Sequence, residues 1–401
     1  MVWAGRAIYR LLSRRGPCEL NNVCHSCDMS EPISDVVQRV LDGALVTRVE
    51  RIEPWFVFRV YLDAEPRSVI VKQLRDDPNG WRIDPAQVAT EVAALRFVER
   101  LGLDIAPRLL AVDGSAHALV LEDLHPRVPL PEVLIDGDPA LAEAGLLDFA
   151  HTLGSLNAGT AGRDAAFAAR SGAQSPEEGD LDRWRETLGF VEAFGVDVPP
   201  GVTEDIGWMF DELGDPGAFL AMSNGDAATN NFLVAPGLDG KLIDYEFARF
   251  RHALLDVVCF FVHGPQWVTL PDPGPREDAY RSTLACAVPE AEDDARFGLG
   301  LSAACLSYAL LRLQRLQKLA PRRPGDLSRL QLVATLEAAA RVAAERGFLR
   351  ELGGWCAEVA AAIRRRWRDT DVDLGPLPPW LSRDERSERI IDDARLVSDG
   401  A

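Results

Sequence analysis

The spacing of apolar residues changes once along the chain, near residue 124, and this change limits the folds that the sequence can adopt. Before residue 124, short segments alternate apolar and polar residues, which is the pattern of half-buried strands. These segments predict a three-strand antiparallel meander over 44–52, 57–62 and 68–74, followed by a helix over 85–101 and an apolar run at 118–121. The first part of the chain therefore predicts a small sheet with one helix.

After residue 124 almost every segment has the 3.6-residue period of a helix. The predicted helices cover roughly 139–160, 180–194, 202–213, 253–262, 296–319, 328–346 and 350–368. A hairpin at 231–244 is the one predicted exception, because two short apolar runs flank turn residues. The predicted fold class is α+β, with a small N-terminal antiparallel sheet plus helix and a large, mainly helical C-terminal lobe that contains the hairpin.

Composition divides the chain into four parts. Residues 1–29 are rich in arginine but lack the continuous apolar core of a secretory signal, so we expect a leader or a disordered arm. Cysteines in this arm have no second pair at zinc-finger distance, which disfavours a metal site there. Residues 30–124 form the expected N-terminal lobe and residues 125–375 the helical lobe. Residues 376–401 follow a proline-rich stop and are expected to be a charged tail.

The charge balance excludes several classes of partner. The chain has 43 basic and 62 acidic residues, a net charge of −19, which disfavours binding to nucleic acid or to an anionic membrane. No apolar stretch reaches the ~18 residues that a membrane span needs. The seven cysteines are scattered, as in proteins of a reducing compartment, so we expect a cytoplasmic protein. The sequence leaves the oligomeric state open.

Three polar residues lie at fixed places around the predicted hairpin. Asn231 and Asp244 fall at its open end, where opposed side chains have Cβ atoms about 4.5–5.5 Å apart. Both offer hard oxygen ligands that suit Mg²⁺. Asp226 lies on the loop before the first strand, where it can face what the metal holds. The order Asp-x-x-x-x-Asn, hairpin, Asp is also that of the protein kinase metal site.

A kinase-type site also needs a lysine on the third strand and an acid on the next helix. Lys72 lies within the apolar strand 68–74, in a chain with only three lysines. Glu91 projects beside the apolar face of the helix 85–101, and a carboxylate that faces a core requires a cation. We therefore expect Lys72 to pair with Glu91, in position to contact the α- and β-phosphates of ATP. Glu99 also projects near that face and stays an alternative partner.

At this point the sequence resembles the aminoglycoside phosphotransferase and choline kinase group of small-molecule kinases, over about residues 40–265. The motifs that carry the resemblance are Val69-Ile-Val-Lys72-Gln, Thr90-Glu91-Val, Ala106-Pro-Arg, Leu119-Val-Leu-Glu-Asp-Leu124, Leu156-Asn-Ala-Gly-Thr160, Gly225-Asp226 with Asn231, Ile243-Asp244-Tyr-Glu246 and Leu255-Asp256. The resemblance implies a protein kinase-like two-lobe fold. It also implies that the N-terminal lobe binds ATP and that the helical lobe carries the catalytic and substrate sites.

The resemblance implies a role for each matching residue. Asp226 corresponds to the catalytic base, Asn231 and Asp244 to the Mg²⁺ ligands, and Lys72 with Glu91 to the pair that anchors the phosphates. The connector Leu121, Glu122, Asp123 and Leu124 corresponds to the segment whose backbone groups hold adenine. Asp256 corresponds to an acid that steadies the catalytic loop, and Glu246 to a glutamate of methylthioribose kinase-like members that is a candidate ligand of a second metal.

The sequence departs from the family at three places. Asn224 stands where the family usually has a histidine, Ala228 where it often has a basic group, and the first hairpin, 51–56, lacks glycine. Two functions therefore stay open. The first is an ATP-dependent phosphotransferase that acts on a hydroxyl of a small molecule, such as an amino sugar attracted by the acidic clusters of the helical lobe. The second is a kinase-like regulatory protein that binds nucleotide and is catalytically weak or inactive.

Overall fold

The structure is a computed structural model that describes residues 32–52, 56–73, 85–136, 139–171, 187–235, 239–262, 273–322 and 327–372. Several sequence predictions lie outside these residues. They are the arm at 1–29, the glycine-free turn at 53–55, the start of the helix predicted at 180–194, the acidic cluster at 177–182, and the tail at 376–401.

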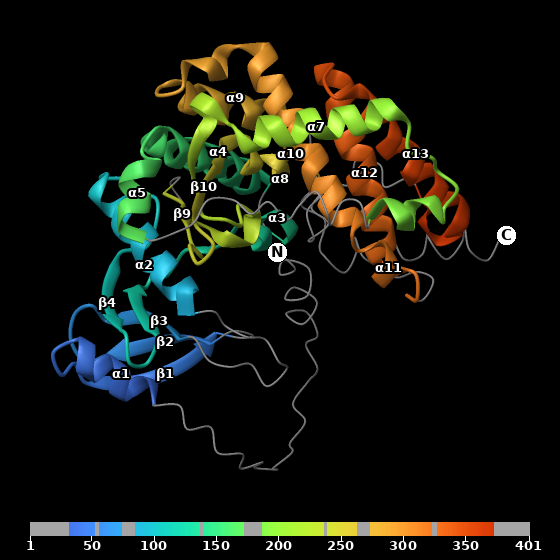
Figure 1. Ribbon diagram of the computed structural model, residues 1–401. Coiled ribbons are helices and arrows are strands. Elements are labelled where there is room, and N and C mark those ends of the chain that lie inside the picture. The colour runs from blue at the N-terminus through green and yellow to red at the C-terminus, as the bar shows by residue number, and fades with distance from the viewer. Residues whose placement is uncertain are drawn as a thin grey trace.

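Five antiparallel strands form the sheet of the N-terminal lobe (Figure 1). The strands are β1 (Val46–Ile52), β2 (Val57–Leu62), β3 (Ser68–Gln73), β4 (Leu109–Asp113) and β5 (Ala118–Glu122), in the order β1-β2-β3-β5-β4. The predicted meander is present, and the apolar run at 118–121 continues it as β5. The sequence prediction did not include β4, which pairs with β5 at the edge of the sheet.

Helices cover the two faces of this sheet, and strand alternation decides which side chains they meet. On one face, Val36 of α1 (Ile33–Val40) shares a core with Val69 and Val71 of β3. On the other face, α2 (Pro85–Arg100) shares a core with β5. Because side chains alternate along β3, Lys72 points away from Val71 and toward the side on which α2 lies.

Ten helices with described bounds lie in the second lobe (Figure 1). They are α3 (Leu130–Asp136), α4 (Pro139–Thr160), α5 (Asp164–Ser171), α7 (Pro200–Gly214), α8 (Val258–Phe261), α9 (Gly274–Ala285), α10 (Asp294–Leu313), α11 (Leu316–Leu319), α12 (Leu327–Arg346) and α13 (Arg350–Arg366). Short 3₁₀ turns are η2 (Gly217–Phe219), η3 (Thr229–Asn231), η4 (Ala253–Leu255), η5 (Pro289–Glu292) and η6 (Arg368–Thr370). The α4 helix is buried along most of its length and forms the centre of the lobe.

The helical lobe contains more strand than the sequence predicted. The hairpin is present as β8 (Phe232–Val234) and β9 (Lys241–Leu242), but β6 (Val128–Pro129) adds a third strand to it. A separate pair joins β7 (Leu220–Ser223) to β10 (Arg249–His252). The prediction of a single exception was therefore wrong, because strands of two to four residues are too short to show a period.

Two predicted helices are divided in the structure. The segment predicted at 253–262 is η4 followed by the short α8, and the one predicted at 296–319 is α10 followed by α11. The α9 helix was not predicted at all. None of the described helices is both long and apolar enough to cross a bilayer.

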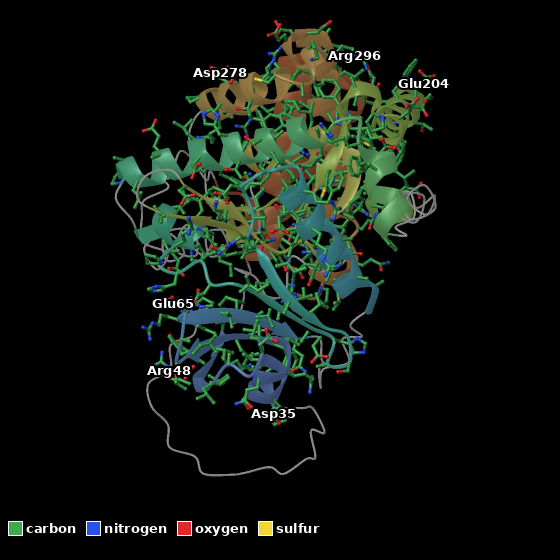
Figure 2. All side chains as sticks on the ribbon, turned by 90° about the vertical axis from the view of Figure 1, so that its left-hand side faces the viewer. Asp35, Arg48, Glu65, Glu204, Asp278 and Arg296 are labelled. Atoms are coloured by element: carbon green, nitrogen blue, oxygen red, sulfur yellow. The ribbon has the colours of Figure 1, made fainter. Side chains whose placement is uncertain are left out.

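Charged side chains cover the outside of both lobes (Figure 2). Arg48 and Glu65 lie on the sheet lobe, whereas Glu204, Asp278 and Arg296 lie at the far end of the helical lobe.

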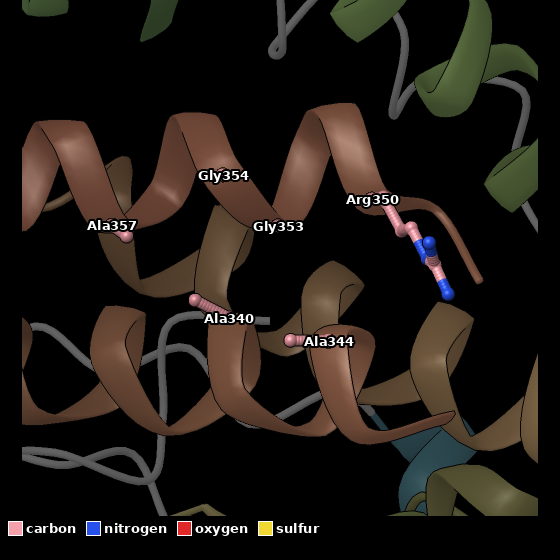
Figure 3. A pocket seen from close by; sticks show the side chains of 6 residues that line it. All are labelled: Ala340, Ala344, Arg350, Gly353, Gly354 and Ala357. Carbon is pink, nitrogen blue, oxygen red and sulfur yellow. The ribbon is translucent and has the colours of Figure 1, made fainter. Parts of the chain in front are cut away.

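A depression of about 440 Å³ lies between α12 and α13 (Figure 3). Its lining is mostly small residues, which let the two helices approach closely: a Cβ on Gly353 would lie 2.8 Å from the Cβ of Ala343. Arg350 is the one charged side chain of the lining. We treat the depression as a consequence of close helix packing.

Candidate active site

Asp226 lies on the loop that joins β7 to η3 and β8. The loop is held at both ends, since the Gly225 N–H donates to Ser223 Oγ at 2.9 Å and Asn231 Nδ2 donates to the Asp226 carbonyl at 2.9 Å. The same Asn231 amide lies 3.2 Å from Asp226 Oδ2. Burial raises the pKa of Asp226, and the charge of Asp244 raises it further, against the lowering effect of Arg251. Asp226 is thus a carboxylate on a loop that hydrogen bonds fix in place, and its proton affinity is increased.

Lys72 forms ion pairs with three carboxylates at the lobe junction. Its Nζ lies 2.8 Å from Glu91 Oε2 on α2 and 2.8 Å from Glu246 Oε2, and it also bonds Asp244 Oδ1. Burial alone would lower the pKa of Lys72, but Asp244, Glu91 and Glu246 together raise it well above its usual value. The Lys72 and Glu91 pair expected from the sequence is present, and it is shared with two acids of the helical lobe.

Asp244 follows β9 in a left-handed backbone conformation, with φ of 67°. A non-glycine residue in this region costs about 1–2 kcal/mol, and such residues cluster at functional sites. The Ile243 N–H donates to the Asn231 carbonyl at 2.9 Å, so the hairpin ends with Asn231 beside the residue before Asp244. The structure therefore brings the two predicted metal ligands to the same end of the hairpin.

The acids at this junction have the chemistry of a divalent-cation site. Glu91, Asp244 and Glu246 each place a carboxylate oxygen within 4.8 Å of the others. Burial raises the pKa of Glu246 to about 7, with the charge of Asp244 adding to the effect and Lys72 opposing it. Carboxylate and amide oxygens are the ligands that Mg²⁺ takes, so these residues fit the ion that the sequence motif implies.

A buried polar network supports the Asp226 loop from behind. Asp256, which is fully buried, accepts hydrogen bonds from Ser223 Oγ at 2.5 Å and Asn157 Nδ2 at 3.2 Å, and an ion pair from Arg251 at 2.7 Å. Asn157 of α4 also donates to the Met222 carbonyl at 3.0 Å and accepts from Tyr280 at 2.8 Å. Asp256 thus reaches the Asp226 loop through Ser223, which fixes the Gly225 N–H.

The sequence prediction missed Asn157 and Arg251 as members of this network. Asn157 lies within one of the motifs that carry the family resemblance, and a buried amide in an apolar helix requires partners, so a signal was present. Arg251 had no such signal because its partner depends on the pairing of β10 with β7.

Two histidines of the helical lobe have structural contacts. His252 is fully buried, stacks on Phe219 with ring centroids 5.2 Å apart, and lies 3.4 Å from Glu212. His151 Nδ1 lies 2.9 Å from Thr283 Oγ1. A further histidine of this lobe, His263, lies outside the described residues.

Comparison with known proteins gives a match in structure alone. No protein family model matches the sequence, and no curated protein sequence matches it. A proposed aminoglycoside phosphotransferase from Ralstonia eutropha has a similar solved structure, with a TM-score of 0.50 and 11% identity over 82% of this chain and 97% of that chain. The chain has the aminoglycoside phosphotransferase fold. The predicted resemblance and the α+β, protein kinase-like two-lobe fold class are thus confirmed at the level of the fold.

Two further solved structures match this chain with lower scores. Choline kinase LicA from Streptococcus pneumoniae is 15% identical over 77% of this chain and 99% of that chain, with a TM-score of 0.43. Macrolide 2'-phosphotransferase MphH from Brachybacterium faecium is 20% identical over 73% of this chain and 98% of that chain, also with a TM-score of 0.43.

In this aminoglycoside phosphotransferase fold, the connector at 121–124 is partly occupied by contacts of its own. Leu121 pairs with Ile70 in the sheet, and the Glu122 N–H donates to the Arg108 carbonyl at 2.9 Å. The Asp123 carboxylate accepts from Ser68 at 2.7 Å and pairs with Arg59 at 2.8 Å. Although burial raises the pKa of Asp123, these bonds lower it overall. The Leu124 carbonyl accepts from the Arg127 N–H at 3.0 Å. The Glu122 N–H and the Leu124 carbonyl are therefore engaged within the protein.

Gly225 requires glycine both for its backbone conformation and for lack of space. Its φ is 92°, and a Cβ there would lie 2.2 Å from the Phe247 carbonyl oxygen. We expect Gly225→Ala to lower the free energy of unfolding by more than the ~1–2 kcal/mol that the backbone conformation alone costs, because the loop must also move. Urea unfolding followed by circular dichroism measures this.

Gly162→Ala is the matched control for that substitution. Gly162 has a similar φ of 67°, but a Cβ there meets nothing within 4 Å. The free energy of unfolding of Gly162→Ala should fall only by the cost of the backbone conformation, about 1–2 kcal/mol. Equal losses in the two variants would contradict the close approach of Gly225 to Phe247.

Proposed function

We propose that the protein is an ATP-dependent phosphotransferase that moves the γ-phosphoryl group to a hydroxyl of a small molecule. The observation that supports it most strongly is the joint ion-pair cluster of Lys72, Glu91 and Asp244, which combines both lobes, with Asp226 nearby on a fixed loop. In this proposal residues 30–124 bind nucleotide and residues 125–375 hold the catalytic residues and the acceptor, in a cytoplasmic protein.

Lys72 and Glu91 form the phosphate-anchoring pair. Glu91 accepts the Tyr245 N–H at 3.4 Å as well as the Lys72 ammonium, so it fixes the lysine against the strand end that carries Asp244. Lys72 can exchange its Asp244 contact for phosphate oxygens and keep Glu91. Asn231 and Asp244, with Glu246 beside them, would hold Mg²⁺, which neutralises phosphate charge when bound.

Asp226 takes the proton of the acceptor. The acceptor oxygen forms a bond to the γ-phosphorus, the bond from that phosphorus to the β,γ-bridging oxygen breaks, ADP leaves, and the hydroxyl proton passes to the Asp226 carboxylate. The raised pKa of Asp226 favours this transfer, and the Asn231 amide keeps the carboxylate aimed. Most of the rate gain comes from positioning and charge neutralisation.

A kinase-like regulatory protein that binds nucleotide without efficient transfer is the second candidate. Ala228 favours it, because a basic group at that position would add positive charge near the γ-phosphate and alanine adds none. The use of the Glu122 N–H by Arg108 also reduces what the connector offers to adenine.

Two measurements on the full chain separate the candidates. We expect Mg-ATP at millimolar concentration to raise the melting temperature, and one class of acceptor among sugars, amino sugars, amino alcohols, macrolides and hydroxy acids to give ADP release above the rate without acceptor. Stabilisation without ADP release from any class would favour the regulatory protein. If Mg-ATP did not stabilise the protein and no acceptor gave ADP release, both candidates would be contradicted.

A further inference from the structure

The first strand of the N-terminal sheet has an outer edge that no described strand covers. In the order β1-β2-β3-β5-β4, β1 is an outer strand, at the end of the sheet away from the helical lobe (Figure 1). It has seven residues, more than any other strand of the sheet, and residues 47–52 are all exposed. The opposite outer strand, β4, is shorter and packs with α1 and α2. The edge of β1 is therefore the more accessible of the two.

The hydrogen bonds of β2 determine which backbone groups of β1 point outward. The Leu62 N–H donates to the Arg67 carbonyl at 2.9 Å, so the even-numbered residues of β2 bond β3. The Asp63 N–H donates to the Leu45 carbonyl at 3.1 Å, so the odd-numbered residues bond β1. Their partners on β1 are residues 48, 50 and 52. Because neighbouring residues of a strand direct their backbone groups to opposite sides, the N–H and C=O of Val49 point away from the sheet.

Two opposite charges lie on one face of this edge. Arg48 Nη2 lies 3.2 Å from Glu50 Oε2, and both side chains are more than half exposed. Tyr61 of β2 orders these charges, because its hydroxyl donates to Glu50 Oε2 at 3.1 Å and its ring centroid lies 4.0 Å from the Arg48 guanidinium carbon. Val49 lies on the other face and is 41% exposed. The edge thus combines an ordered pair of charges with an exposed apolar side chain.

A second copy of β1 fits this edge when it runs antiparallel with Val49 opposite Val49. The Val49 N–H of each copy then donates to the Val49 carbonyl of the other. In the same register, Arg48 of each copy lies opposite Glu50 of the other, so four charges alternate in sign around a two-fold axis. Opposed pairs of unlike charge stabilise an antiparallel pair of strands.

The charges also select this register against its neighbours. A two-fold axis at Arg48, at Glu50 or at Arg51 would place like charges directly opposite each other, which destabilises a strand pair. Charged residues on edge strands usually prevent pairing for this reason. In β1 the order Arg48, Val49, Glu50 instead makes the strand complementary to itself.

We propose that the protein forms a homodimer in which the β1 edges of two copies pair antiparallel about Val49, so that the two N-terminal sheets become one. The inference goes beyond the proposed phosphotransferase function and does not depend on it, because it uses no residue of the candidate active site. A bulge between Val46 and Arg48 keeps the regular match short. The dimer is therefore a weak one, with a Kd in the micromolar range.

Charge-reversal variants of the full chain test the dimer and its register. Sedimentation velocity over a micromolar concentration series measures Kd for the wild type, Arg48→Glu, Glu50→Arg and the double variant that exchanges the two charges. Arg67→Glu is the control, since Arg67 forms a similarly exposed pair with Glu65 at 2.8 Å in the turn between β2 and β3. The melting temperature of each variant verifies that it is folded.

Each single reversal places like charges opposite each other at two sites, so Kd should rise at least ~10-fold. The double variant Arg48→Glu/Glu50→Arg restores unlike pairs, and its Kd should return to within ~3-fold of the wild type. An equimolar mixture of the two single variants should form a heterodimer with a similar Kd, because every charge then lies opposite its counter-charge. Arg67→Glu should leave Kd unchanged.

Three results would overturn the inference. A wild type that sediments as a monomer throughout the micromolar series would exclude the dimer. A dimer with the same Kd in both single variants would place the interface elsewhere on the protein. Weaker association in the single variants, with no recovery in the double variant or in the mixture, would exclude the antiparallel register about Val49. None of these measurements uses ADP release, so their outcome is separate from that of the phosphotransferase proposal.

Discussion

Replacing Asp226 with asparagine is expected to lower kcat for acceptor-dependent ADP release by about 10²–10⁴-fold, the usual contribution of a positioned general base. Asparagine keeps the size and the hydrogen bond to the Asn231 amide but cannot accept the proton. KM for ATP should change little, because Lys72 and the carboxylates around it are untouched. Steady-state kinetics with a coupled ADP assay measure both parameters.

The stability of Asp226→Asn gives an independent test. Burial and the charge of Asp244 raise the pKa of Asp226 in the folded protein. A raised carboxyl pKa means that the ionised form costs stability at pH values above the unfolded pKa, so the neutral amide should leave the melting temperature at pH 7.5 equal or higher. Asp278→Asn, at an exposed position, is the control and should change neither activity nor melting temperature. A kcat within 3-fold of the wild type would contradict the role of Asp226 as base.

Removal of the Asp256 carboxylate should have the largest effect on stability. In Asp256→Ala, Arg251 loses its ion pair at 2.7 Å, and Ser223 and Asn157 lose an acceptor, all at a fully buried site. Breaking a buried pair by deleting one partner typically costs about 3–5 kcal/mol, because a charge is left without compensation. The free energy of unfolding in urea measures the loss.

Two further variants identify the cause of that loss. Tyr280→Phe removes one hydrogen bond at the other end of the network and should cost only about 1 kcal/mol. Adding Arg251→Met to Asp256→Ala should recover part of the stability, since the unpaired guanidinium is then absent. A loss below ~1 kcal/mol in Asp256→Ala would show that the network does not support the fold as the structure indicates.

Much of the fold could be predicted where apolar spacing is regular and local. The strand at 57–62, the helix at 139–160 and the helix predicted at 328–346 agree with β2, α4 and α12 to within one residue at each end. The pairs β7 with β10 and β6 with β8 were missed, because their order follows from contacts between segments far apart in the chain. The division of α10 from α11 was missed because the apolar period continues across it.

The residues of the candidate site also divide into those that the sequence could predict and those that it could not. Lys72 and Glu91 could be paired from sequence because each is a charge that faces a core, although Glu99 near the same helix face stayed an alternative. Arg251 carries no such local sign, because its role depends on the pairing of β10 with β7 behind the Asp226 loop. The pairing of Lys72 with three carboxylates at once was also unexpected, because Glu246 reaches the lysine from the turn after Asp244.

The ion pairs of Lys72 also fix the charge that a ligand has to supply at the lobe junction. Glu91, Asp244 and Glu246 carry three negative charges when ionised, and the Lys72 ammonium balances one of them. Two positive charges are then missing, which is the deficit that one alkaline-earth ion removes and one sodium or potassium ion does not. A nucleotide that arrives together with a divalent ion therefore adds less negative charge beside these acids than bare ATP, which would meet acids already in excess.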